Sequence, residues 1–540
     1  MTTRLARYLF NSIRNRIPTR YSGYKATNYV IQSNPKSQLK DFPGVCQEIE
    51  NIIANPSSIV SSISHKISNI SHEIVSPFLG HPVIGRYSYC SDKDLRKAFI
   101  NYQMEEINKK SFDLDSKSFD LDSRIDCFFK IADLIEGKYW NKMIASTIVG
   151  QGKTIYEAEI DCVGELVDLL RFNVQYVTEI INKQPISTMT ETNISQYLPM
   201  RGFMTAITPF NFTAIAANLS LTPLLFGNTV FWKPSEKALL SNRLFYDICL
   251  EAGIPSSLLK FIVMEPKIYG TIITEHPELS GLLFTGSNQT FMTLYKNIME
   301  NMDQYNNYPR IVGETGGKNF HFADSTADVK LLAKKTFEAA FGYSGQKCSA
   351  CSRLYLPEEL YDDFMNEMLL LMNQVSTYHY SVIDKQNYDR IKNILEDIKK
   401  SPLTKIVMGG KTNDEETYYI EPTIFISENG NNQFMTEEFF GPILGIRLYS
   451  EMKNIINECV NCTQYALTGA IFSQDEIFIE QMSRVFENSC GNLYINDGCT
   501  KAVVGRQPFG GLGLSGTNDK VGDINFLFRL FNQRNIKIAN

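Results

Sequence analysis

No stretch of this 540-residue chain is continuously apolar over the ~20 residues that a membrane-spanning helix requires. Basic residues are not in excess either: 53 Lys and Arg are outnumbered by 59 Asp and Glu, which gives a formal net charge of −6. Proteins that bind nucleic acid usually carry an excess of basic residues, because Lys and Arg neutralise the phosphate charges. The composition therefore argues against a membrane-embedded or nucleic-acid-binding protein, while its 43% hydrophobic residues suffice for a large core.

Regular cysteine pairs and histidine motifs are also lacking. The 11 cysteines are scattered without the spacing of a disulfide framework, so we expect free thiols in a reducing compartment. The six histidines form no ligand motif such as H-E-x-x-H. Metal sites are usually announced by such local spacings, so the sequence predicts no metal.

The first 40 residues contain no Asp or Glu but eight Lys or Arg. Arg4, Arg7, Arg14 and Arg16 alternate with apolar residues in a way that fits a basic amphipathic helix, and Ser and Thr are interspersed. This pattern is typical of a mitochondrial transit peptide, which we place at residues 1–25. The alternative is a frayed basic tail without a role.

From about residue 200 the pattern becomes α/β. Strand-like runs alternate with helix-like ones, and Pro or Gly stands at the junctions, which favours a parallel sheet with crossover helices. The expected strands are Phe203–Ile207, Thr229–Trp232, Phe261–Val263, Leu282–Phe284 and Arg310–Val312, and the expected helices are 213–226, 238–252 and 267–275. A second unit begins near Val312, with helices at Ala327–Phe341 and 357–373 and a strand at Arg353–Leu356.

Cys348 and Cys351 form a C-x-x-C motif that has several interpretations. Zinc is disfavoured because no second C-x-x-C or nearby His completes the ligands. A redox dithiol is disfavoured because the motif stands two-thirds of the way along a long chain. A single nucleophile remains, or a buried structural cysteine.

The surroundings of Cys348 favour the nucleophile. A Gly-containing loop, 342–347, precedes it, and Glu314 stands on a Gly-flanked turn about 35 residues earlier. A thiol and a carboxylate on two such loops fit a nucleophile and its general base. A G-x-G-x-x-G match at 511–516 is not taken as a dinucleotide fingerprint, because it does not open a helix after a strand.

Seven motifs along the chain resemble the aldehyde dehydrogenase superfamily in order and spacing. They are ITPFNF (207–212), FWKPSE (231–236), FTGS (284–287), GETGGKN (313–319), GQKCSA (345–350), EEFFGP (437–442) and PFGG (508–511). Further stretches, such as AEIDCVGELVDLLRFN (158–173) and SGTNDK (515–520), resemble the branch of that superfamily that oxidises glutamate semialdehyde to glutamate.

The resemblance implies an α/β protein with the aldehyde dehydrogenase fold. It implies a Rossmann-like NAD-binding domain (26–183 and 203–312), an α/β catalytic domain (313–505), and a small β oligomerisation flap and tail (184–202 and 506–540). It further implies a homodimer in the mitochondrial matrix that acts on a small-molecule substrate.

The resemblance also implies a mechanism and a cofactor. Cys348 is expected to attack the aldehyde, Asn211 to hold the oxyanion, and Glu314 to activate water. NAD is the expected cofactor, favoured over NADP because a carboxylate at 236 repels a 2′-phosphate. Its expected contacts are Thr208, Lys233, Glu236, Gly286, Ser287, Glu438 and Phe440.

For the substrate, the resemblance implies contacts from Ser349, Phe212, Phe509, Lys501, Ala502 and Glu165. The chain departs from the family at position 501, where Gly is usual and Lys stands here. The main alternative is an aldehyde dehydrogenase for another semialdehyde or an aliphatic aldehyde. A non-catalytic descendant is disfavoured because Cys348, Glu314 and Asn211 are all present, and a CoA-acylating enzyme is disfavoured by Glu314.

Overall fold

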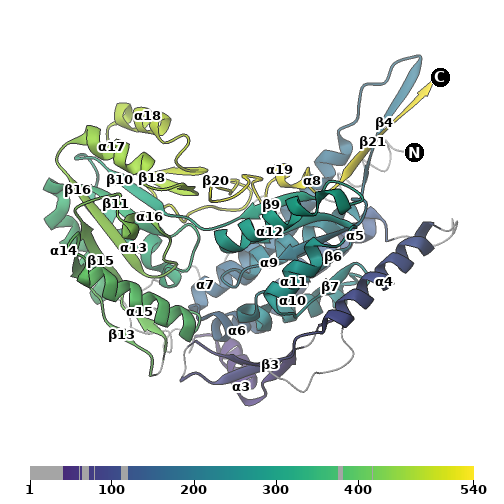
Figure 1. The fold of residues 1–540 in the computed structure, drawn as a ribbon, viewed down its shortest axis with the longest axis horizontal. Coiled ribbons are helices and arrows are strands. Elements are labelled where there is room, and N and C mark those ends of the chain that lie inside the picture. The colour runs from purple at the N-terminus through teal and green to yellow at the C-terminus, as the bar shows by residue number, and fades with distance from the viewer. Residues whose placement is uncertain are drawn as a thin grey trace.

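The structure is a computed structural model that describes residues 41–59, 61–63, 72–77, 80–110, 119–374, 381–415 and 417–539, with only the backbone for 105–110. The expected transit peptide at 1–25 lies outside these residues. The chain forms two lobes, each built on a sheet with flanking helices, and a β-ribbon that extends from one of them (Figure 1). In the part of the chain that the structure describes, no helix combines the length and the apolar character needed to cross a bilayer.

The first lobe is centred on a five-stranded sheet in which every pair of neighbours is parallel. This confirms the strand and helix alternation expected from the sequence. Across the sheet, the strands are β7 (Leu259–Phe261), β6 (Val230–Lys233), β5 (Phe203–Ile207), β8 (Leu279–Thr285) and β9 (Arg310–Glu314).

Strand β7 ends two residues before the expected Val263. The backbone of Val263 is used elsewhere: its N–H donates to Ser61 Oγ at 2.6 Å and its carbonyl accepts from the Cys90 N–H at 2.8 Å. Backbone groups of an edge segment must find partners, and here the amino-terminal part of the chain supplies them.

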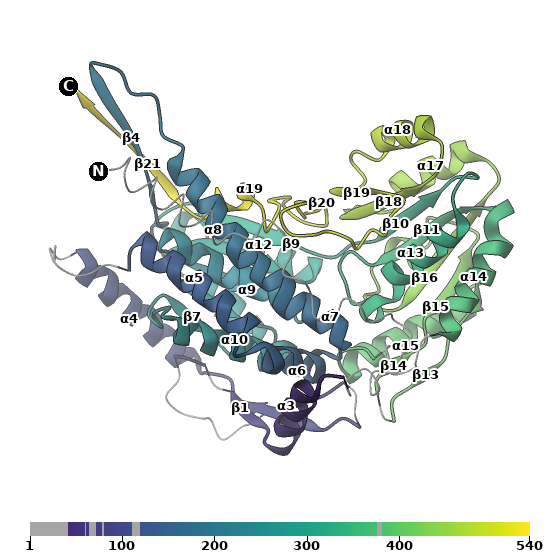
Figure 2. The same ribbon diagram turned by 180° about the vertical axis from the view of Figure 1, so that it is seen from behind.

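Helices cover both faces of this sheet (Figures 1 and 2). The predicted helix at 213–226 is α-helical only to Leu221 and continues as a 3₁₀ turn, Thr222–Phe226, because Pro223 has no N–H for the α-helical bond. The helices of this lobe are α5 (Leu121–Glu136), α6 (Trp140–Gln151), α7 (Ile155–Glu159), α8 (Leu166–Asn182), α9 (Thr213–Leu221), α10 (Leu239–Ala252), α11 (Pro266–Thr274) and α12 (Asn288–Glu300).

The amino-terminal segment packs along the open side of the first lobe. A three-stranded sheet of order β1-β3-β2 runs beside α3 and leads into α4. The bounds are α3 (Pro43–Ala54), β1 (Ser57–Ile59), β2 (His72–Val75), β3 (Val83–Tyr87) and α4 (Asp92–Lys110).

The second lobe is built on a seven-stranded sheet that is parallel except for its edge strand β12. The strand order is β12 (Thr404–Met408), β15 (Thr423–Ser427), β16 (Ile443–Tyr449), β11 (Cys351–Pro357), β10 (Asn319–Ala323), β18 (Thr468–Phe472) and β19 (Asn492–Ile495). Its helices are α13 (Val329–Phe341), α14 (Tyr361–Asn373), α15 (Lys385–Lys400), α16 (Gln433–Thr436), α17 (Met452–Asn461) and α18 (Glu476–Val485). Short pairs β13 (Thr412–Asn413) with β14 (Tyr419–Ile420), and β17 (Tyr465–Ala466) with β20 (Leu512–Gly513), lie outside this sheet.

The last segment of the chain returns from the second lobe to the first, through α19 (Ile524–Leu527), and ends in the ribbon. There β21 (Asn532–Ala539) pairs antiparallel with β4 (Glu191–Leu198) over its whole length. The Arg310 guanidinium fixes the entry to β21, because it donates to the Phe531 carbonyl at 2.7 Å. Both views show the ribbon projecting from the body of the molecule.

Candidate functional site

The carboxyl end of the five-stranded sheet brings three of the predicted cofactor residues together. Lys233 ends β6 and its ammonium lies 2.8 Å from Glu236 Oε1. Thr208, just after β5, accepts the Trp232 indole N–H at 2.9 Å, and its own N–H donates to the Lys233 carbonyl. Because neighbouring parallel strands end at one edge, residues at 208 and 233 meet there, where open α/β sheets bind ligands.

Strand β8, the neighbour of β5 in the sheet, adds a helix amino terminus to the same edge. Ser287 follows β8 and is the N-cap of α12, where its hydroxyl accepts the Thr290 N–H at 3.3 Å. Gly286 donates its N–H to the Glu314 carbonyl at the end of the adjacent β9. Ser287 is exposed, so the unpaired N–H groups of this helix start face solvent and form an anion site.

Cys348 lies in a tight turn between a 3₁₀ segment, Gly342–Gly345, and strand β11. The Asn319 amide holds this turn, because Nδ2 donates to the carbonyls of Cys348 at 2.8 Å and of Ala350 at 2.9 Å. Gly317 packs so closely that a Cβ there would stand 2.4 Å from the Cys348 carbonyl oxygen. Cys348 as a whole residue is half-buried.

The backbone before Cys348 is strained. Tyr343, Ser344 and Gly345 all lie in the left-handed region, at φ of 52°, 53° and 65°. A Cβ at Gly345 would stand 2.2 Å from the Gly441 carbonyl, so only glycine fits. Hydrogen bonds hold the other two in place, from the Tyr343 hydroxyl to the Gln151 carbonyl and from Ser344 Oγ to the Ser381 carbonyl.

Asn211 comes from the first lobe and reaches the turn of the second lobe that carries Cys348, the predicted nucleophile. We call residues 346–350 the nucleophile turn. Its Nδ2 donates to the Gln346 carbonyl at 3.0 Å, two residues before Cys348, and the side chain is buried. An amide nitrogen carries two hydrogens, so one remains for another acceptor. The structure therefore joins the two motifs that the sequence separates by more than 130 residues.

Glu314, the last residue of β9, is buried, and its Oε1 has no hydrogen-bond partner among the described residues. Burial raises the pKa of this carboxyl to about 8, although nearby Lys520 opposes the shift. The Lys520 ammonium is itself held by the carbonyls of Gly491 and Gly510, at 2.8 and 2.9 Å. A buried acid without a partner and with its pKa near neutrality has the properties of a general base.

The thiol of Cys348 stands close to two carboxylates. Burial raises its pKa, and the neighbouring Glu314 and Glu438 raise it further. Glu438 accepts the Gly317 N–H at 2.9 Å, and burial raises its own pKa to about 7. The nucleophile, the predicted base and a predicted cofactor contact thus occupy one site.

Phe440 and Phe210 close this site from opposite lobes. Phe440 has a left-handed φ of 52°, and its ring meets Phe210 edge to face at a centroid distance of 5.8 Å. A small cavity beside the nucleophile turn is lined by Lys347, Glu438 and Phe440, among others. The predicted contacts at 438 and 440 therefore border open space next to the nucleophile.

Phe212 rests under a buried ion pair that the sequence analysis missed. The Lys153 ammonium lies 4.5 Å above the Phe212 ring and 2.6 Å from Asp161 Oδ2. Asp161 in turn accepts the N–H groups of Thr213 and Ala214 at the start of α9. No local motif announces this pair, which forms between a helix end and a π-helical turn, Ile160–Glu165.

The remaining predicted substrate residues lie around the nucleophile turn and the last loops. Burial raises the pKa of Glu165 to about 7, with Asp161 adding to the shift and Lys153 opposing it. Ser349 is buried, whereas Ala502 and Phe509 are half-buried. Lys501 is not left-handed, so the change from Gly costs no backbone strain, and its ammonium pairs with Glu338 of α13 at 2.9 Å.

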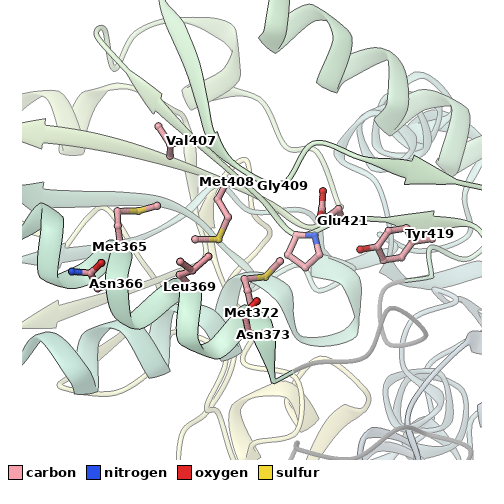
Figure 3. Close-up of a pocket in the computed structure, with 11 residues that line it drawn as sticks. Met365, Asn366, Leu369, Met372, Asn373, Val407, Met408, Gly409, Tyr419 and Glu421 are labelled. Carbon is pink, nitrogen blue, oxygen red and sulfur yellow. The ribbon is translucent and has the colours of Figure 1, made fainter.

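A cavity of about 520 Å³ lies elsewhere, between α14 and the edge of the second sheet (Figure 3). Met365, Leu369, Met408 and Tyr419 are among its lining residues, and none of the predicted site residues is. It holds no pair of acid and nucleophile, so its size does not make it the catalytic site.

Comparison with known proteins agrees with this geometry. A model described as the aldehyde dehydrogenase family matches residues 66–535. The chain is 38% identical to the mitochondrial delta-1-pyrroline-5-carboxylate dehydrogenase of Danio rerio over 502 residues, 91% of this chain and 88% of that protein. It is 38% identical to the corresponding Homo sapiens protein over 510 residues, 92% of this chain and 88% of that one.

Among solved structures, the chain is similar to the delta-pyrroline-5-carboxylate dehydrogenase from Mycobacterium tuberculosis bound with NAD. The TM-score is 0.87 at 32% identity, over 97% of this chain and 96% of that one. The α/β fold expected from the sequence is confirmed by this likeness.

Proposed function

The chain belongs to the aldehyde dehydrogenase family, and we propose that it oxidises L-glutamate γ-semialdehyde, which is in equilibrium with 1-pyrroline-5-carboxylate, to L-glutamate with NAD⁺. The single observation that carries this proposal is the joint placement of Asn211, Cys348 and Glu314. Asn211 and Glu314 come from different elements, and both lie beside the turn that carries the Cys348 thiol. The relatives' names supply the substrate class, and proline catabolism is the process in which such a step belongs.

Cys348 is the proposed nucleophile. Once the thiol proton has passed to the Glu314 carboxylate, Sγ adds to the aldehyde carbon as the thiolate, and the carbonyl oxygen becomes an oxyanion. The Asn211 amide hydrogen that is not used on Gln346 stabilises that charge, together with the Cys348 N–H. One such donor lowers a barrier by ~3–4 kcal/mol. Asn319 and Gly317 position the turn that carries the thiol.

Glu314 is the proposed general base. Its buried carboxylate takes a proton from the water that hydrolyses the Cys348 thioester, which releases the acid product. The pKa of about 8 suits this role, because the group can both accept and return a proton near neutral pH. Another semialdehyde or an aliphatic aldehyde is the alternative substrate, since these three residues act on the aldehyde carbon alone.

NAD⁺, when bound, would accept the hydride that the Cys348 adduct loses as it becomes the thioester. Lys233 and Glu236 would hold its adenosine ribose, and the carboxylate of Glu236 disfavours a 2′-phosphate. Thr208, Gly286 and the exposed N-cap Ser287 would face the pyrophosphate, as the open helix start allows. Glu438 would hold the nicotinamide ribose, and Phe440 would pack beside the ring.

The substrate's remote carboxylate is proposed to bind Ser349 and the backbone of Lys501 and Ala502. The pairing of Lys501 with Glu338 supports a backbone role at this position rather than a charge contact. Phe212 and Phe509 would enclose the aliphatic part of the substrate, and Glu165 would line the pocket.

The domain division stays as expected from the sequence: NAD-binding at 26–183 and 203–312, catalytic at 313–505, flap and tail at 184–202 and 506–540. The seven-stranded sheet and both strands of the ribbon fall within these ranges, which supports the division, whereas β9 (Arg310–Glu314) of the five-stranded sheet runs across the expected boundary between 312 and 313. Exposed apolar residues lie on the ribbon (Ile538) and in the segment just before β4 (Ile186 and Met189), which supports a homodimer formed through this part of the chain. The relatives are named as mitochondrial, and we place the protein in the matrix.

The direct test measures NADH formation with glutamate semialdehyde for wild type, Cys348→Ala and Cys46→Ala. Cys46 is also half-buried, but it lies on α3. We expect activity in wild type and Cys46→Ala and a loss of at least about 10³-fold in Cys348→Ala. Activity retained in Cys348→Ala would contradict the mechanism, and activity only with simple aliphatic aldehydes would contradict the substrate.

A further inference from the structure

Three soft ligand groups meet in the second lobe behind the nucleophile turn. They are His321 of β10, Cys351 at the start of β11, and Cys499 in the loop after β19. One ligand atom from each lies within 4.8 Å of the other two, and all three residues are buried to at least 99%. Cys351 is thus not isolated: its neighbours come from 30 residues before it and 148 residues after it.

The contacts around the group hold each side chain in position. His321 Nδ1 lies 2.8 Å from Thr336 Oγ1 on α13, which leaves Nε2 facing the Cys499 N–H at 3.2 Å. The Cys499 thiol donates to the Ser349 carbonyl at 3.3 Å. A partner that fixes the far nitrogen of a histidine is the usual surrounding of a metal-bound imidazole.

We propose that His321, Cys351 and Cys499 bind one soft divalent cation of the zinc type. Two thiolates and an imidazole are the ligands that Zn²⁺ prefers, and its bond lengths place such atoms about 3.5–3.8 Å apart. The observed spacing needs only small movements to reach that arrangement. On binding, the ion would coordinate His321 Nε2, which now accepts the Cys499 N–H. The two cysteines would bind as thiolates and release their protons to solvent. The Ser349 carbonyl or a water would be the fourth ligand.

A disulfide between Cys351 and Cys499 is the competing use of the same atoms. A disulfide requires the two sulfur atoms to approach to about 2.05 Å, and it does not involve His321. It also requires an oxidant such as a peroxide to reach two thiols that are fully enclosed. The three-way convergence therefore favours the cation.

The bound ion would fix the loop that starts at Cys499 to the central strands of the sheet. That loop continues into Lys501 and Ala502, and Cys351 stands three residues after Cys348. The ion would thus raise thermal stability and hold the walls of the active site without touching the substrate. This inference does not depend on which aldehyde the enzyme oxidises.

The test uses the full chain carrying Cys348→Ala, which removes the nucleophilic thiol as a competing ligand. Cd²⁺ is titrated under reducing conditions, and the thiolate-to-cadmium absorption band and the bound metal per chain are measured. We expect one Cd²⁺ per chain, a rise in Tm, and displacement by Zn²⁺.

Adding Cys499→Ala or His321→Gln should weaken binding by about tenfold or more, since even outer contacts of metal ligands contribute that much. Adding Cys490→Ala, a buried thiol outside the group, should leave binding unchanged. Cys351→Ala is made alongside Cys499→Ala, so that the test does not depend on a single variant that fails to fold. Absence of a thiolate band, binding that survives both variants, or an oxidised Cys351–Cys499 crosslink in place of metal would overturn the proposal.

Discussion

At the scale of single residues, the chemistry depends on how burial changes ordinary groups. Glu314 is a common carboxylate, but it ends a strand inside the protein, where its charged form loses solvation. The free thiol of Cys348 has a raised pKa for the same reason, with Glu314 and Glu438 adding to it. The Glu314 carboxyl and the Cys348 thiol therefore stay protonated, and so uncharged, to a higher pH than the same groups in water.

The pH dependence of turnover should reflect Glu314. Its pKa is raised to about 8, so below that pH most molecules hold the protonated form, which cannot accept a proton. Where thioester hydrolysis limits the rate, kcat should rise with pH and level off above about 8. Stopped-flow absorbance of NADH between pH 6 and 10 measures this profile.

The variant Glu314→Gln should still form the thioester but hydrolyse it about 10²–10⁴-fold more slowly. The expected trace is a burst of one NADH per active site followed by a very slow phase. Glu300→Gln, an exposed carboxylate at the end of α12, serves as the control and should behave like wild type. A Glu314→Gln enzyme with normal steady-state turnover would refute the role of this base.

Ser349 should determine which aldehyde is preferred. In Ser349→Ala, we expect KM for glutamate semialdehyde to rise about 10- to 150-fold, since one hydrogen bond to a charged group is lost, worth about 1.5–3 kcal/mol. KM for propanal, which has no carboxylate, should change little. Steady-state kinetics with both substrates measures the difference, and equal effects on the two would favour the broader aldehyde dehydrogenase.

At the scale of elements, the nucleophile turn is held by a neighbouring strand rather than by its own sequence. Asn319, at the start of β10, donates to Cys348 and Ala350 and accepts the Thr468 N–H from β18. One side chain therefore joins the turn to two strands of the central sheet. The residues just before the turn have left-handed backbone conformations, which are strained. The hydrogen bonds of Asn319 help to hold the turn in this conformation.

Asn319→Ala should lower both stability and turnover. The loss of three buried hydrogen bonds is expected to reduce the free energy of unfolding by about 2–4 kcal/mol, and kcat should fall more than KM rises because the thiol is misplaced. Chemical denaturation and steady-state kinetics measure the two effects. Asn461→Ala, exposed at the end of α17, is the control. Normal kcat in a destabilised Asn319→Ala enzyme would show that the residue only supports the fold.

At the scale of the whole molecule, the ribbon pairs two strands that are far apart in the sequence, β4 and β21. It projects from the body of the molecule. Met189, beside β4, is 95% exposed and Ile186 is 86% exposed. Apolar side chains this exposed on an extended element are typical of an interface between subunits.

Met189→Asp should therefore shift the protein from dimer to monomer, because a carboxylate would be buried in the subunit interface. Light scattering coupled to size-exclusion chromatography measures the mass of each variant. Met299→Asp, a comparable change at an exposed methionine of α12, should leave the dimer intact. A monomeric wild-type protein would contradict the proposed assembly.

The sequence alone determined the strand and helix alternation of the first lobe, because apolar periodicity and the junction Pro and Gly residues are local signals. It also indicated which residues to propose for the chemistry, because Cys348, Glu314 and Asn211 lie in motifs that resemble one family. Strand ends were less accurate: β7 stops early because the amino-terminal segment takes over the backbone of Val263, a partner about 200 residues away.

Only the tertiary structure decided what surrounds those residues. The pKa of Glu314 and the burial of the Lys153–Asp161 ion pair depend on how the chain packs, and the pairing of Lys501 with Glu338 joins distant segments. The sequence predicted no metal site because its histidines and cysteines follow no local spacing. His321, Cys351 and Cys499 meet because parallel strands bring separate parts of the chain side by side, and no local pattern records that proximity.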